Sequence, residues 1–188
     1  GDPDVIEKKR QLMEQIDGMS EQNPMLGLRG CRLAIKFPIL PEMQVRAIAT
    51  AAAQLKKEGL DPKPEIMIPL VSVVPELAKL RELAEKIIAE VAEEQGVELE
   101  IPVGTMIELP RAAVTADEIA TQADFFSFGT NDLTQTTFGF SRDDAGKFLD
   151  AYYDAKIFEN DPFAKIDQKG VGKLMETAIK LGKPVNNK

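Results

Sequence analysis

The chain has 188 residues, 44% hydrophobic and 29% charged, which is the composition of a globular protein long enough to bury a core. Its net charge of −8 at pH 7 disfavours binding to a phosphate backbone, so we expect no nucleic-acid partner. Without histidine and with only Cys31, the chain cannot build a Ser-His-Asp or Cys-His site or an internal disulfide, and no apolar run suggests a membrane partner.

An amphipathic helix and a break come first in the chain. A helix over residues 4–17 would carry these apolar residues near one face: Val5, Ile6, Leu12, Met13 and Ile16. The stretch 18–27 contains glycines and a proline and interrupts the helical pattern. We therefore expect residues 1–22 to form an N-terminal helical flank and residues 23–188 to form the main domain.

Apolar runs alternate with helical patterns through the rest of the chain. Residues 31–38 fit either a short strand or an ordered loop. The runs that predict strands are 64–71, 101–110 and 123–129, and the first of them predicts a strand buried on both faces. The predicted helices are 41–59, 75–96, 115–122, 143–156 and 170–182. This alternation predicts βα units and a parallel sheet, and hence an α/β fold.

Several helix ends carry residues with known capping preferences. Gly59 and Gly96 end the helical patterns before them and suit C-terminal caps. Thr115 is followed three residues later by Glu118, which predicts a capping box at the start of the helix over 115–122.

Polar residues cluster just after two of the predicted strands. Glu108 follows one apolar run, and Thr130, Asn131 and Asp132 follow the next. Ligands of α/β proteins bind beyond the carboxyl ends of parallel strands, so this position predicts a site. Glu108 and Asp132 together could share Mg²⁺, which prefers a few carboxylates with water and substrate oxygens. The alternative, that both carboxylates only cap turns, stays open at this point.

Other polar residues suggest contacts with an anionic ligand. Gly129 allows a close backbone approach, and Thr130 and Asn131 could bind a carboxylate or phosphate oxygen; the alternative is an Asx-type turn made by Asn131 or Asp132. Arg29, in "GLRGCR", could clamp such a group, or it could be an ordinary surface arginine. Cys31 has no histidine to activate it, so we expect a structural thiol.

Long stretches of the chain resemble one family. The blocks "NPMLGLRGCRL", "PEIMIPLV", "GTMIELPRAA", "TADEIA", "FFSFGTNDLTQTTFGFSRDDAGKFL" and "DPFAKIDQKGVGKL" are similar, in the same order, to the pyruvate, phosphate dikinase family of phosphoenolpyruvate (PEP)-utilising enzymes. The resemblance runs over about residues 23 to 182 and concerns the C-terminal PEP/pyruvate-binding (β/α)8 barrel. It implies that the chain carries about strands four to six of that barrel with flanking helices, an incomplete barrel.

The resemblance also implies an activity and a set of roles. Enzymes of this family convert ATP, phosphate and pyruvate to AMP, pyrophosphate and PEP, and a phosphohistidine domain delivers the phosphoryl group to Mg²⁺-bound pyruvate enolate. By matching motifs, Glu108 and Asp132 would be the Mg²⁺ ligands, and Gly129, Thr130 and Asn131 would contact pyruvate or PEP. Arg29 would hold phosphoryl or carboxylate oxygens, and Arg29 and Asn131 would act in catalysis.

The chain departs from the family pattern in ways that limit these expectations. Leu28 stands where the family usually has histidine. Two further substrate arginines would precede residue 1, and the "CGEHGG" segment with the family's proton-donating cysteine would follow residue 188, so Cys31 is not that donor. We therefore expect the isolated chain to be inactive. The resemblance implies a homodimeric parent enzyme in the cytoplasm, or in a plastid or other organelle.

Two alternative functions remain open at this point. One is a Mg²⁺-dependent lyase or aldolase barrel that uses the same pyruvate-enolate chemistry. The "FSRDDAGKF" block, which resembles the dikinase family, argues against this alternative. The other is a non-catalytic assembly module.

Overall fold

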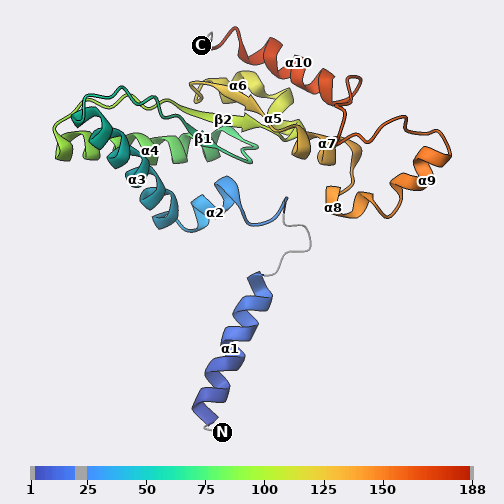
Figure 1. Cartoon of the computed structure of the whole chain (residues 1–188), viewed down its shortest axis with the longest axis horizontal. Helices are drawn as coiled ribbons and strands as arrows, with labels where there is room; N and C mark the ends of the chain where they lie inside the picture. The colour runs from blue at the N-terminus through green and yellow to red at the C-terminus, as the bar shows by residue number, and fades with distance from the viewer. Residues whose placement is uncertain (1–2, 20–24, 187–188) are drawn as a thin grey trace.

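A three-stranded parallel sheet lies at the centre of the main part of the chain (Figure 1). The computed structural model describes residues 3–19 and 25–186. In chain order the elements are α1 (Pro3–Met19), α2 (Gly30–Lys36), α3 (Ile39–Lys57), β1 (Ile66–Ile68), α4 (Val74–Gln95), β2 (Val103–Ile107), α5 (Pro110–Val114), α6 (Ala116–Ala120), β3 (Phe126–Phe128), α7 (Thr130–Phe138), α8 (Arg142–Ala145), α9 (Leu149–Asp154) and α10 (Val171–Gly182).

The strand order is β1-β2-β3, and both pairs are parallel. Parallel neighbours need crossover connections, which α4 supplies between β1 and β2, and α5 with α6 supplies between β2 and β3. The predicted βα alternation and the three predicted strands are therefore confirmed. Within the described residues the sheet is open, with β1 and β3 at its edges.

Small and branched side chains pack the helices onto the sheet. α3 lies along α4, where Ala49 and Ala53 of α3 and Leu77 of α4 are fully buried. α10 packs against α5 and α6, over the part of the molecule that leads into β3 (Figure 1). Gly96 ends α4 in the left-handed conformation, with φ of 64°, so the predicted glycine cap is confirmed.

Helix α1 stands apart from the sheet and its covering helices in Figure 1. It contains the predicted helix over 4–17, and the apolar side chains at its predicted face are exposed: Val5, Ile6, Leu12, Met13 and Ile16. Among the described residues, no helix combines the length and the apolar content that crossing a bilayer requires.

Two predictions around β1 are wrong. Residues 31–38 are neither strand nor loop, because α2 covers most of them. In such a short apolar run, a helical period cannot be told from a strand. Here Cys31 is buried, and Ala34 and Ile35, three and four residues later, pack against the same core. β1 is not buried on both faces, because Met67 is 40% exposed between two buried isoleucines.

Three further differences concern helix ends. The predicted capping box is wrong, because the Thr115 hydroxyl donates to the Arg111 carbonyl in the last turn of the preceding helix, α5. The single helix predicted over 143–156 is two short helices, α8 and α9. The polar stretch after β3 is the first turn of α7 rather than an isolated turn.

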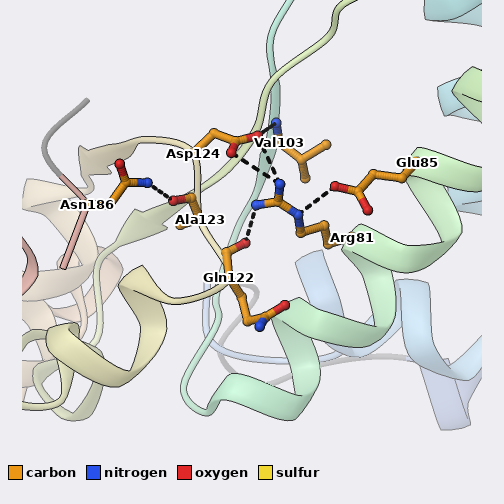
Figure 2. A network of polar contacts seen from close by, with 7 residues as sticks. All are labelled: Arg81, Glu85, Val103, Gln122, Ala123, Asp124 and Asn186. Atoms are coloured by element: carbon orange, nitrogen blue, oxygen red, sulfur yellow. Dashed lines mark hydrogen bonds and ion pairs between the residues drawn. The ribbon is translucent and has the colours of Figure 1, made fainter.

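An arginine in α4 fastens the chain that leads into β3 (Figure 2). Arg81 donates from Nε to Glu85 at 2.7 Å, from Nη1 to the Gln122 carbonyl at 2.8 Å, and from Nη2 to Asp124 at 3.1 Å. The Asp124 carboxylate also accepts the Val103 N–H at 2.9 Å. The cluster thereby ties α4, the start of β2 and the residues before β3 together.

We predict that Arg81→Ala lowers the free energy of unfolding by about 1–3 kcal/mol, since it leaves the half-buried Asp124 carboxylate and the Gln122 carbonyl without this donor. Urea unfolding followed by circular dichroism measures the change. Arg46→Ala is the matched control, because Arg46 also pairs with two carboxylates, Glu90 and Glu94, but at an exposed surface where ion pairs contribute little. Equal losses in the two variants would contradict the role of the Arg81 cluster.

Candidate metal and substrate site

The carboxyl ends of β2 and β3 bring the predicted site residues side by side. Ile107 pairs with Phe128 in the sheet, so Glu108 and Gly129 leave neighbouring strands at the same level. The Gly129 N–H donates to the Ile107 carbonyl at 3.1 Å and continues this pairing by one residue. α7 begins at the next residue, which places Asp132 in its first turn.

Glu108 is buried, with only 4% of its surface exposed. Its Oε1 accepts the Leu70 N–H at 2.6 Å, and its carboxyl group is hydrogen-bonded to the Asp132 side chain. Asp132 is held in turn by Gln135, whose Nε2 donates to Oδ1 at 3.0 Å. Neither Glu108 nor Asp132 serves as a side-chain cap of the helix that follows it, so turn capping does not explain their placement.

The environment of Glu108 favours its protonated form. Burial raises its pKa from 4.5 to about 7, and the hydrogen bond and charge of Asp132 act in the same direction. The Leu70 N–H and the charge of Arg29 oppose this shift. The buried Glu108 carboxyl group faces the half-buried Asp132 carboxylate, so a proton on Glu108 relieves the repulsion between the two groups, and a divalent cation could take the place of that proton.

The donor set fits Mg²⁺ better than a metal that needs an all-protein cage. Glu108 and Asp132 offer carboxylate oxygens, and in the described part of the chain no group of three or more histidine, cysteine or acidic side chains gathers to hold a metal. Mg²⁺ is commonly bound through one or two carboxylates, with water and substrate oxygens completing its octahedron.

Gly129 is required by close packing against Glu108. A Cβ atom at this position would lie 2.6 Å from both Cβ and Oε2 of Glu108 and 2.7 Å from the Met106 sulfur. These are distances that real side chains do not adopt, so any larger residue would displace the carboxyl group. Because the Gly129 N–H donates to the Ile107 carbonyl, this amide is not available to a ligand.

The remaining predicted residues lie around this pair. Thr130 and Asn131 are exposed in the first turn of α7. Arg29 is exposed just before α2, and its charge acts on the Glu108 carboxyl. Leu28 is exposed beside Arg29. The structure therefore gathers Arg29, Glu108 and the 129–132 turn into one region.

Two residues of the site were missed by the sequence analysis. Leu70 supplies a backbone N–H, and no sequence pattern announces which amide will face a carboxylate. Gln135 is 2% exposed and lies three residues after Asp132 on the same helix. That spacing would have identified Gln135 if the stretch had been predicted as a helix.

In the metal-free chain we predict that Glu108 titrates near pH 7 and that Asp132→Asn lowers its pKa, because the substitution removes the facing charge. Carboxyl ¹³C NMR of the labelled protein measures both. The folded pKa exceeds the unfolded value, so the stabilisation linked to Glu108 is present below about 4.5 and is lost as the pH rises through about 7. Glu108→Gln should remove this loss, and an ordinary pKa in the unaltered chain would refute the assignment.

We predict that Gly129→Ala lowers the free energy of unfolding by about 1–3 kcal/mol, because its Cβ overlaps the Glu108 carboxyl group. Gly146→Ala is the matched control, since nothing lies within 4 Å of a Cβ built there, and we expect a change within about 0.5 kcal/mol. Chemical unfolding measures the free energy of unfolding of both variants. Similar losses in the two variants would show that Gly129 is not packed as described.

The chain is similar over nearly its whole length to known proteins. A family model described as "PEP-utilising enzyme, PEP-binding domain" matches residues 4–186. Pyruvate, phosphate dikinase of Clostridium symbiosum is 55% identical over 92% of this chain, and that of Giardia intestinalis is 53% identical over 96%. The chloroplastic pyruvate, phosphate dikinase of Flaveria trinervia is 54% identical over 94%.

The matched region is only a part of each relative. It amounts to 20% of the Clostridium symbiosum and Giardia intestinalis proteins and 18% of the Flaveria trinervia protein, so the chain spans about a fifth of their length. The family match nevertheless covers both carboxylates, the glycine between the strand and α7, and Arg29. The chain belongs to the PEP-binding domain family of the PEP-utilising enzymes.

Proposed function

We propose that this chain is the PEP/pyruvate-binding part of a pyruvate, phosphate dikinase and that its site handles the pyruvate half-reaction. The observation that carries the proposal is the buried Glu108 carboxyl hydrogen-bonded to Asp132 at the ends of adjacent parallel strands, in a chain over half identical to the Clostridium symbiosum enzyme. In this half-reaction a phosphohistidine of the parent enzyme would lose its phosphoryl group. The P–N bond breaks, and a P–O bond forms to the enolate oxygen of pyruvate, giving PEP.

The proposed roles follow from what each residue offers. Glu108 and Asp132 would hold Mg²⁺, which supplies positive charge against the enolate and phosphoryl oxygens when it is bound. Thr130 and Asn131 present exposed polar side chains at the start of α7, where a substrate carboxylate finds partial positive charge. Gly129 would contact the substrate through its backbone, and its missing Cβ leaves room for the Glu108 carboxyl group at the strand end. Arg29 would hold the phosphoryl or carboxylate oxygens, and with Asn131 it would orient the reacting groups.

We infer that the Glu108–Asp132 pair releases a proton when it binds a cation. The hydrogen bond between Glu108 and Asp132 requires a proton, and that proton would leave when the pair binds a cation. The Leu70 N–H keeps Oε1 of Glu108 in place throughout, while Oε2 faces Gly129. The pair is thereby pre-arranged, and positioning with electrostatic stabilisation is the main source of catalysis in phosphoryl transfer.

The proposal also covers the finer architecture and the partners. We infer that β1, β2 and β3 correspond to about strands four to six of a (β/α)8 barrel, with residues 1–22 as a helical flank and residues 23–188 as the barrel part. A phosphohistidine domain and a second copy of the parent enzyme would be the partners. Because the chain contains no histidine, it cannot carry the phosphoryl group itself, and we expect no PEP formation by the chain alone.

Oxalate, a mimic of the enolate, should bind to the chain weakly and only when Mg²⁺ is present. The two carboxylates would bind the cation, and the cation would in turn bind oxalate. Asp132→Asn should weaken this binding about tenfold or more, whereas Asp144→Asn, an exposed carboxylate paired with Lys147, should leave it unchanged. Isothermal titration with and without Mg²⁺ measures the affinity. Binding of oxalate that ignores both Mg²⁺ and Asp132 would contradict the proposed site.

A further inference from the structure

The three residues that follow the middle of β1 form an unusual bridge between the site and α2. The Ile68 carbonyl accepts the Thr105 hydroxyl at 2.7 Å, which fixes the end of the strand to β2. The next peptide group, between Pro69 and Leu70, then turns away from the sheet. Its N–H is the donor that reaches Glu108.

The two ends of this single peptide group bind different parts of the protein. The Pro69 carbonyl accepts the Cys31 N–H of α2 at 3.1 Å, and the Leu70 N–H donates to Oε1 of Glu108 at 2.6 Å. Hydrogen bonds linked through one amide polarise each other, so the first strengthens the second. The peptide therefore connects the start of α2 with the buried carboxyl group.

The same cysteine also holds the following peptide group. The Cys31 sulfur donates to the Leu70 carbonyl at 3.1 Å, and Cys31 is completely buried. Burial raises the pKa of this thiol to about 11, so the sulfur keeps its proton at neutral pH and remains a donor. Cys31 thus hydrogen-bonds the carbonyl groups on both sides of the Leu70 Cα atom, through its backbone N–H and through its thiol.

These hydrogen bonds are needed because Leu70 has a backbone conformation that leucine does not favour. Its φ is 60°, in the left-handed region, where a bulky side chain is an outlier that persists only when the surrounding structure holds it. Gly30 allows the close approach, since a Cβ there would lie 3.0 Å from the Pro69 carbonyl oxygen and its own φ is 55°. Leu70 is itself buried, so solvent cannot replace these contacts.

We infer that Cys31 is a positioning residue for the metal and substrate site: through the Pro69–Leu70 peptide it fixes Oε1 of Glu108 and presents Oε2 toward the ligand side. Cys31 acts in this role through its hydrogen bonds at the start of α2 rather than through thiol chemistry, and it touches no substrate itself. Its consequence for cation binding rests on the proposed function, whereas its consequence for the Leu70–Glu108 hydrogen bond does not.

The test compares Cys31→Ala, which removes the thiol donor, with Cys31→Ser, which keeps a donor at nearly the same place. In the metal-free chain, ¹H–¹⁵N NMR follows the Leu70 amide proton, whose signal reports its hydrogen bond to a carboxylate and is identified by its shift in Glu108→Gln. We expect Cys31→Ala to move this signal upfield and Cys31→Ser to restore it. Leu33→Ala, a packing change in the same helix, is the control and should leave the signal in place.

The second readout is the affinity for Mn²⁺ with oxalate. We expect Cys31→Ala to weaken it about tenfold, which is the usual scale for residues that orient a metal ligand, and Cys31→Ser to recover most of it. If the unaltered chain binds no cation, the proposed function fails, while the Leu70 signal still decides the positioning role.

An unchanged Leu70 signal in folded Cys31→Ala would overturn the inference, and so would equal displacement in the alanine and serine variants. If Cys31→Ala does not fold, Cys31→Ser decides alone, and a displaced Leu70 signal in that variant contradicts the role of the donor.

Discussion

Glu108 carries a carboxyl group into the edge of a parallel sheet, where water reaches almost none of it. Burying such a group is costly unless it is hydrogen-bonded, and here the Leu70 N–H and the Asp132 side chain are its partners. The same burial raises the pKa of Glu108 to about 7, and we propose that the pair exchanges this proton for a cation. The arrangement of the surrounding elements is best understood as the means of holding this one group.

Three separate parts of the chain contribute to that task. The register of β2 with β3 places Glu108 beside Gly129, and the missing Cβ of Gly129 makes room for the carboxyl group. The start of α2 fixes the strained Leu70 peptide from the other side. Farther away, Arg81 ties α4 to the residues that lead into β3 (Figure 2).

The sequence predicted the features that depend on local pattern. Alternating apolar runs and helices identified the parallel sheet, and Gly96 marked the end of α4. It also indicated which polar residues would follow the strands, although the roles of Arg29, Glu108 and residues 129–132 stay predictions. It missed α2 because seven residues do not distinguish a helical period from a strand. The positive φ of Leu70 is imposed by tertiary contacts to Cys31 and Glu108, which no local pattern records.

We propose that the Glu108–Asp132 pair, with the turn after β3, binds a divalent cation together with an enolate-like ligand. A crystal structure of the chain grown with Mg²⁺ and oxalate would show this site. We expect one cation bound by carboxylate oxygens of both residues, with oxalate completing its coordination beside Gly129 and the Leu70 N–H still donating to Oε1 of Glu108. A cation bound elsewhere, or oxalate bound without contact to a cation held by Glu108 and Asp132, would contradict the proposed site.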